Sequence, residues 1–162
     1  MSPPILGRNL RATGPGAFVG HSPLCDPTSS HSASWQNTSL KFETDFLPRL
    51  DEGFFGWAWK SFAGPLHDDT IDGPTKNLYL SPASISPDIE STISFKGFPE
   101  TFLVVGGAER MWDDVRTLRE RLVRDRGEEK FTVYEPPDGV HVPLLFKWHE
   151  PERTRGLELL SR

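Results

Sequence analysis

Two residues of this sequence have the types and positions that acid–base chemistry requires. Glu109 follows an apolar run at residues 101–105, and His141 follows an alternating run at residues 130–135. A carboxylate that accepts a hydrogen bond from one imidazole nitrogen leaves the other nitrogen free to take a proton from a nucleophile. Glu109 and His141 therefore have, in outline, the arrangement of the acid and the base of a catalytic triad. Asp113, one helical turn after Glu109, is the alternative acid.

The segments around these residues predict an α/β fold with parallel strands and flanking helices. The run at 101–105 is typical of a strand buried on both faces, and residues 130–135 predict a second strand. Between them, residues 110–126 predict an amphipathic helix, because its apolar residues recur at helical spacing. A right-handed crossover places the loops after the two strands at the same carboxyl edge. The apolar positions of the helix are Met111, Val115, Leu118 and Leu122.

The remaining segments are less regular. Residues 1–16 predict an irregular leader, residues 17–22 a short strand, and residues 23–99 a loop-rich region punctuated by proline. Within that region, residues 50–63 predict a helix whose aromatic residues pack in the core. A final helix begins near Pro151. Its expected packing residues are Leu157, Leu159 and Leu160, and the aromatic residues of the earlier helix are Phe54, Phe55, Trp57, Trp59 and Phe62.

Composition excludes several classes of function. The net charge of −5 argues against nucleic acid and anionic membranes as partners, since both require a basic surface. No stretch approaches the length of a membrane span, and the N-terminus lacks the apolar core of a signal peptide, so we expect a cytoplasmic protein. His67, Asp68 and Asp69 predict a solvated loop, because three adjacent residues cannot converge on one ion. We expect no metal and no cofactor.

Two longer motifs resemble a known family. Residues 98–109 and Asp113 are similar to the acid-bearing strand and loop of hormone-sensitive-lipase-like esterases, the α/β-hydrolase fold-3 group. Residues 136–141 resemble the histidine loop of that family, and residues 144–153 continue the resemblance, most like fungal members. The resemblance implies that residues 17–162 form the C-terminal part of an α/β-hydrolase domain, with an incomplete sheet. The resemblance also implies that Glu109 is the triad acid and that His141 is the general base. The triad acid of the family is commonly aspartate, and glutamate serves the same role.

The catalytic serine of that family has no counterpart in the sequence. Neither the Gly-x-Ser-x-Gly nucleophile elbow nor the His-Gly-Gly oxyanion loop is present. Ser22 follows Gly20 and His21, but the second glycine of an elbow is missing, so we interpret Ser22 as structural. A thiol nucleophile at Cys25 is also disfavoured, because free cysteine is usually a small packing residue.

Two functional hypotheses follow. In the first, the chain is a truncated carboxylic-ester hydrolase that acts on a small-molecule ester and is inactive alone. In the second, the chain is a non-catalytic α/β-hydrolase remnant that acts as an interaction protein. A half-sheet leaves an exposed edge, which predicts a surface for self-association or partner binding. Whether the chain is itself an enzyme stays open at this point.

Overall fold

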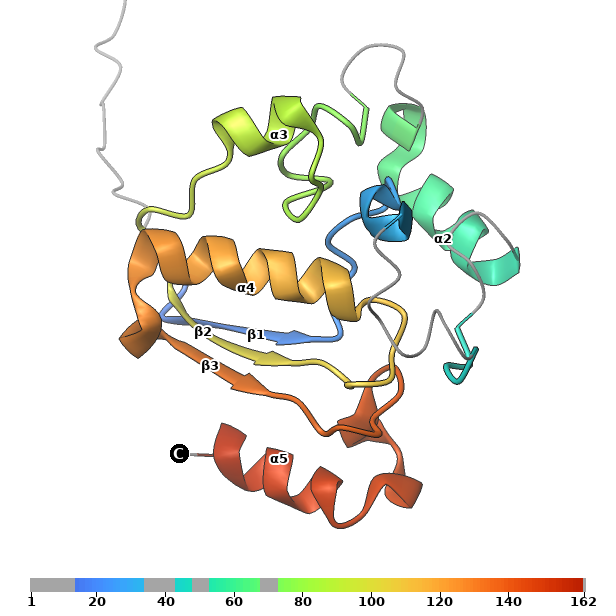
Figure 1. The fold of residues 1–162 in the computed structure, drawn as a ribbon, viewed down its shortest axis with the longest axis vertical. Helices are drawn as coiled ribbons and strands as arrows, with labels where there is room; N and C mark the ends of the chain where they lie inside the picture. Colours follow the sequence, from blue (N-terminus) through green and yellow to red (C-terminus); the bar gives the residue numbers. More distant parts are fainter. Residues whose placement is uncertain (1–13, 34–42, 48–52, 68–72, 162) are drawn as a thin grey trace, which may run out of the picture.

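The computed structural model describes residues 14–33, 43–47, 53–67 and 73–161, and Figure 1 shows the arrangement of its helices and strands. Three parallel strands form one sheet in the order β1-β2-β3. The strands are β1 Ala17–His21, β2 Glu100–Val104 and β3 Phe131–Tyr134. The predicted α/β character is confirmed, and each predicted strand lies within one residue of its expected bounds.

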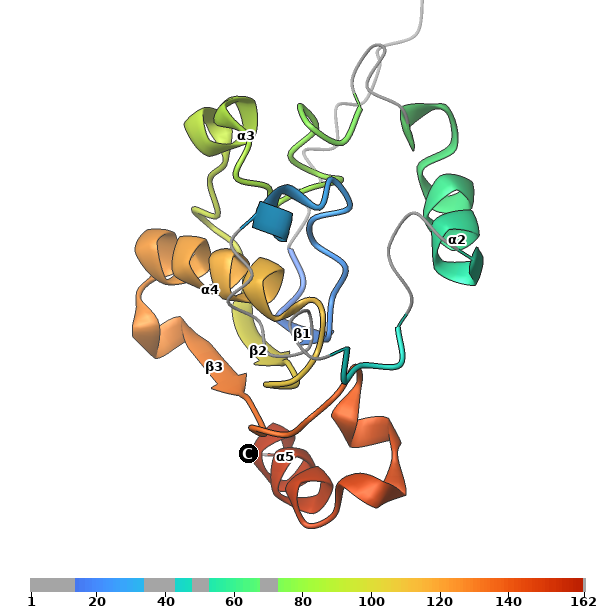
Figure 2. The same ribbon diagram turned by 45° about the vertical axis from the view of Figure 1, so that its right-hand side comes forward.

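Helices cover both faces of this sheet. Helix α4 (Trp112–Arg126) connects β2 to β3 on one face, and α5 (Glu152–Leu160) lies on the opposite face (Figures 1 and 2). The core lies between the sheet and α4, which buries its apolar positions as the helical spacing predicts. Arg116, Arg119, Glu120 and Arg124 of this helix are exposed, whereas Asp113, Asp114 and Arg121 are buried. The central members of the core are Leu103, Val105, Met111, Val115, Leu118, Leu122, Ile89 and Cys25.

A short helix, α3 (Pro87–Thr92), lies within the region 23–99 that the sequence predicts to be loop-rich. Ser86 is its N-cap, and the Ser86 hydroxyl accepts a hydrogen bond from the Ile89 amide at 3.5 Å. Proline is tolerated at the first helical position, because the amide there needs no partner within the helix. The Ser-Pro pair therefore starts a helix here rather than interrupting one.

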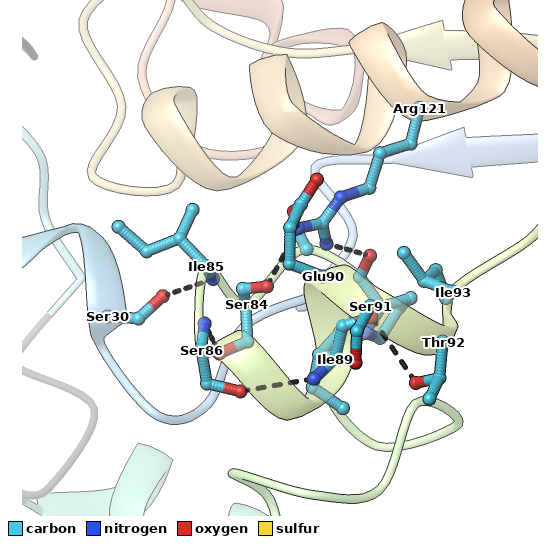
Figure 3. Close-up of polar contacts among 12 residues, drawn as sticks. Ser30, Ser84, Ile85, Ser86, Ile89, Glu90, Ser91, Thr92, Ile93 and Arg121 are labelled. Atoms are coloured by element: carbon cyan, nitrogen blue, oxygen red, sulfur yellow. Dashed lines mark hydrogen bonds and ion pairs between the residues drawn. The ribbon is translucent and has the colours of Figure 1, made fainter.

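Buried Arg121 holds α3 and the preceding loop against α4 (Figure 3). Its guanidinium donates to the carbonyls of Pro82 at 2.8 Å and Ser84 at 2.9 Å, and it pairs with Glu90. A planar guanidinium can satisfy several acceptors at once, so one side chain fixes a loop and a helix together.

Helix α2 (Gly53–Ala63) confirms the prediction of a helix, but its first predicted residues lie outside the described part of the chain. The expected core packing of its aromatic residues is wrong for three of them, since Phe54, Trp57 and Phe62 are 75%, 63% and 78% exposed. The helix lies to one side of the sheet (Figures 1 and 2), and among its aromatic side chains that the structure describes, only Trp59 is buried. Phe55 lies outside the residues whose side chains are described.

The final helix also packs differently from the prediction. The three leucines of α5 are all exposed, at 39%, 36% and 40% for Leu157, Leu159 and Leu160. The buried residue of α5 is Gly156, where a Cβ atom would lie 2.5 Å from Leu144 Cδ2 and 2.6 Å from the Tyr134 ring. Close approach of the helix backbone, not leucine packing, attaches α5 to the sheet.

Five short 3-10 helices complete the described structure. They are η1 Ser30–Ala33, η2 Gly64–His67, η3 Glu128–Lys130, η4 Pro143–Leu145 and η5 Lys147–His149. Among the described residues, no helix has the length and apolarity needed to cross a membrane.

Candidate functional site

The loops that follow β2 and β3 interlock at the carboxyl edge of the sheet. The Gly107 amide donates to the Pro136 carbonyl at 2.9 Å, and the Ala108 amide donates to the Gly139 carbonyl at 2.9 Å. A Cβ atom at Gly106 would lie only 2.2 Å from the Gly139 oxygen, so glycine is required for this approach. The parallel sheet and the α4 crossover therefore bring the acid loop and the histidine loop together, as the sequence predicts.

Glu109 lies at the centre of this region and is fully buried. Its Oε2 atom accepts hydrogen bonds from the Ser22 hydroxyl at 2.6 Å and from the Gly106 amide at 2.9 Å. Burial raises the pKa of Glu109 to about 8, although both hydrogen bonds act in the opposite direction. A carboxyl group that changes charge near neutral pH, in a loop beside a histidine, is a candidate for acid–base function.

Ser22 connects the acid to the histidine loop. Its hydroxyl oxygen donates to Glu109 and accepts a hydrogen bond from the Val142 amide at 2.9 Å. Ser22 is buried and follows β1, so three strand ends contribute to the site. Ser22 thus links Glu109 to the histidine loop, and this contact was not predicted from the sequence.

The backbone beside His141 is strained. Val142 has φ +50°, a left-handed conformation in which a β-branched side chain is a true outlier. Such strain persists only where surrounding contacts hold it, at a cost of about 1–3 kcal/mol, and it concentrates at functional sites. The hydrogen bond from the Val142 amide to Ser22 is one of these contacts.

Asp45 forms a second connection between the two loops. Its Oδ2 atom accepts from the Arg110 amide at 2.9 Å, and its Oδ1 atom accepts from the His141 amide at 3.2 Å. Asp45 is buried, and its charge raises the pKa of both His141 and Glu109, although burial has the larger effect on each group. One carboxylate therefore fixes the backbone next to the acid and at the histidine.

The His141 ring lies in the site without a direct hydrogen bond to Glu109. Its Nδ1 atom is buried and has no hydrogen-bond partner in the part of the chain that the structure describes. Burial lowers the pKa of His141, so the neutral ring is favoured near neutral pH. The two predicted residues are brought to one edge of the sheet, but the acid is hydrogen-bonded to Ser22 and Gly106 rather than to the imidazole.

A second histidine, His21, belongs to the same region. Its Nε2 atom accepts a hydrogen bond from the Leu144 amide at 3.3 Å. Its pKa is lowered, first by burial and then by the charge of His141. A proton on either ring disfavours a proton on the other.

The alternative acid, Asp113, lies in the first turn of α4 and is buried. A carboxylate near a helix N-terminus is stabilised by the helix dipole, which accounts for acidic residues at this position. The hydrogen bonds described above connect Glu109, through Ser22, and Asp45 to the histidine loop.

Asp26, His31 and Asp114 form a buried group whose ligand atoms lie within 4.8 Å of one another. Both oxygens of Asp26 already accept hydrogen bonds from the backbone and hydroxyl groups of Thr28 and Ser30. His31 Nε2 lies 3.0 Å from the Ala83 carbonyl, which requires a donated proton. Both oxygens of Asp26 and the Nε2 atom of His31 are therefore engaged within the fold, and the cluster fits a structural role better than a metal site.

The remaining sequence predictions concern Cys25 and His67. Cys25 is buried and free, and burial raises the pKa of its thiol well above the ordinary value. A protonated, inaccessible thiol is a poor nucleophile. His67 ends the exposed η2 turn, where its Nδ1 atom lies 2.6 Å from the Gly64 carbonyl, while Asp68 and Asp69 lie outside the described residues.

Sequence reasoning missed Asp45, His21 and the role of Ser22. His21 and Ser22 follow a predicted parallel strand, so the rule that places strand ends at one edge could have included them. Asp45 lies in an irregular segment, and nothing in its local sequence indicates contact with residues 110 and 141. Its role depends on the tertiary fold alone.

The sequence matches no protein-family model, and no curated protein is significantly similar to it. The resemblance to hormone-sensitive-lipase-like esterases therefore remains an inference from its motifs.

Proposed function

We propose that this chain supplies the acid and the general base of a serine carboxylic-ester hydrolase. The observation that carries the proposal is the interlocking of the Glu109 and His141 loops through paired backbone hydrogen bonds at the carboxyl edge of a parallel sheet. Sites in open α/β sheets form at this edge. Buried ionisable groups and a strained backbone at the same place support it.

In the proposed reaction, His141 takes the proton of a serine hydroxyl as that oxygen attacks the ester carbonyl, and then donates it to the departing alcohol. The imidazolium formed in this step lowers the pKa of Glu109 and favours its ionised form. Ser22 and Gly106 then hold the carboxylate in place through their hydrogen bonds. The serine and the oxyanion donors come from outside the residues described here.

The proposal is tested by fusing a nucleophile segment upstream of residue 17. The segment carries a Gly-x-Ser-x-Gly elbow and a His-Gly-Gly loop from an esterase, and hydrolysis of p-nitrophenyl butyrate is measured. We expect hydrolysis by the fusion and a loss of at least about 10³-fold in kcat on His141→Ala. Glu109→Ala is expected to lower kcat as well, whereas the exposed His67→Ala is the matched control and retains activity.

Two results would contradict the proposal. If the folded fusion does not hydrolyse the ester, Glu109 and His141 do not have the roles proposed for them. Hydrolysis that survives His141→Ala shows that another base acts. Circular dichroism and a cooperative urea transition establish that each fusion is folded before its rate is interpreted.

A partner-binding role is the second candidate, and the edge of the sheet supports it. Among the described strands, β1 pairs only with β2, and Val19 at its centre is 52% exposed. An open edge strand offers unpaired backbone groups to another chain. Stable self-association of the chain in sedimentation experiments, lost on Val19→Lys, supports this role, whereas a monomer at all concentrations argues against it.

A further inference from the structure

The segment that carries Asp45 contacts both the backbone and the ring of His141. This segment, residues 43–47, lies beside the loop that follows β3 (Figure 2). The Oδ1 atom of Asp45 accepts a hydrogen bond from the His141 amide at 3.2 Å. The ring of the next residue, Phe46, meets the His141 ring edge-on, with centroids 6.1 Å apart. Asp45 is therefore held close to the residue proposed as the base.

The same segment is also attached to the loop that carries the acid. The Oδ2 atom of Asp45 accepts a hydrogen bond from the Arg110 amide at 2.9 Å. The preceding residue, Thr44, donates from its hydroxyl to the Ala108 carbonyl at 3.3 Å. One charged contact and one neutral contact thus hold segment 43–47 on this loop, so substitution can separate the effect of the charge from the effect of the attachment.

Asp45 supplies negative charge at His141 before any reaction begins. Glu109 accepts its hydrogen bonds from Ser22 and Gly106, and its pKa of about 8 leaves it largely protonated at neutral pH. The charge of Asp45, in contrast, raises the pKa of His141 against the larger effect of burial. Asp45 is only 7% exposed, and water and salt screen a buried charge less than one at the surface.

Two other ionisable residues belong to the same region. His21, at the end of β1, has a pKa lowered by burial and by the charge of His141, so its ring is neutral near neutral pH. Arg110 contacts Asp45 through its backbone amide. Neither group can provide negative charge to the imidazole.

We propose that Asp45 is a positioning residue for the general base, which fixes the backbone of His141 and stabilises the positive charge that the imidazole gains on taking the serine proton. This inference rests on the proposed function. In that step the proton moves from the serine oxygen to the imidazole, the oxygen forms its bond to the ester carbonyl carbon, and the carbonyl electron pair moves to the carbonyl oxygen. An opposite charge held beside the imidazole favours its protonated form.

The test follows the ring protons of His141 by NMR during a pH titration of the full chain, without any need for hydrolysis. Asp45→Asn removes the charge and keeps the size of the side chain, so we expect it to lower the pKa of His141. Thr44→Val is the matched control, because it removes the neutral contact of the same segment and should leave that pKa unchanged. In the unchanged chain, the carboxyl carbon shift of Asp45 should change at the midpoint of the His141 titration.

The esterase fusion gives a second measurement. Asp45→Asn should lower kcat about tenfold or more, because the imidazolium is less stabilised. It should also move the acid limb of the kcat/KM profile to lower pH, since the base loses its proton at lower pH. Thr44→Val should leave the acid limb in place.

An unchanged His141 titration in folded Asp45→Asn overturns the proposal, because a merely structural role alters stability alone. An equal shift in Thr44→Val overturns it as well. If Asp45→Asn does not fold, the unchanged chain decides, and a carboxyl carbon of Asp45 that does not respond at the His141 midpoint overturns the proposal. The failure of the proposed function gives a different result, in which the shift on Asp45→Asn persists while hydrolysis by the fusion is absent or does not respond to His141→Ala.

Discussion

Replacing Glu109 with glutamine should remove a pH dependence from the stability of this fold. The pKa of Glu109 is raised from 4.5 to about 8, because burial disfavours the ionised carboxylate. Between these two values the folded state keeps a proton that the unfolded chain has released. The free energy of unfolding therefore falls as the pH rises from 4.5, and the loss is complete above about 8.

The size of this effect follows from the shift. At about 1.4 kcal/mol per pKa unit, the shift corresponds to about 5 kcal/mol as an upper limit. Small domains are stable by only about 5–15 kcal/mol, so ionisation of this one group is a large perturbation. A neutral glutamine has the shape of the protonated acid, and its oxygen can still accept the hydrogen bonds from Ser22 and Gly106.

Urea unfolding at about pH 5 and about pH 9 measures the effect. We expect Glu109→Gln to match the unchanged chain at the lower pH and to exceed it by several kcal/mol at the higher pH. Asp114, whose pKa is also raised by burial, is present in both proteins, so the part of its contribution that comes from burial cancels, whereas the smaller part that comes from the charge of Glu109 does not. Glu120→Gln, at an exposed position on α4, is the control and should follow the unchanged chain at both values. Equal pH dependence in Glu109→Gln and the unchanged chain would refute the reasoning.

Three further predictions concern the contacts that assemble the site. Gly106→Ala should lower the free energy of unfolding by about 3 kcal/mol or more, because the added Cβ atom would lie 2.2 Å from the Gly139 carbonyl oxygen. Gly16→Ala is the control: its Cβ atom has no neighbour within 4 Å, so the free energy of unfolding measured with urea should not change. Ser22→Ala should lower the free energy of unfolding by about 1–3 kcal/mol, because the hydroxyl donates to Glu109 and accepts from the Val142 amide. Loss of the donated hydrogen bond should also raise the pKa of Glu109 further, and a pH titration that leaves this pKa unchanged would contradict the contact. Gly156→Ala should cost about 1–3 kcal/mol through overpacking beneath α5, and an unchanged urea midpoint would show that α5 is not packed as described.

The second half of the chain was predictable from local pattern. The apolar run at 101–105, the helical spacing from Met111 to Leu122 and the alternating run at 130–135 each correspond to one buried element. The parallel crossover then placed the two loops together. An element that buries a continuous apolar face has apolar residues at regular spacing in its sequence, so it can be recognised there. The elements that position Glu109 and His141 are of this kind.

The errors share a physical cause. The exposed aromatics of α2 and the exposed leucines of α5 have residue types that usually pack, but their helices each present a small buried face. Composition alone does not indicate which face of a helix meets the sheet. The contact between Asp45 and the histidine loop spans nearly a hundred residues of sequence, and such contacts depend on tertiary structure that local pattern does not encode.

The most direct test of the account is an NMR titration of the His141 ring in the unchanged chain and in Glu109→Gln. If the acid and the histidine share one site, ionisation of Glu109 changes the local field. The account therefore predicts a step in the His141 ring shifts near pH 8, in addition to its own titration at lower pH, and no such step in Glu109→Gln. Ring shifts that do not change near that pH in the unchanged chain would contradict the claim that Glu109 and His141 share one site.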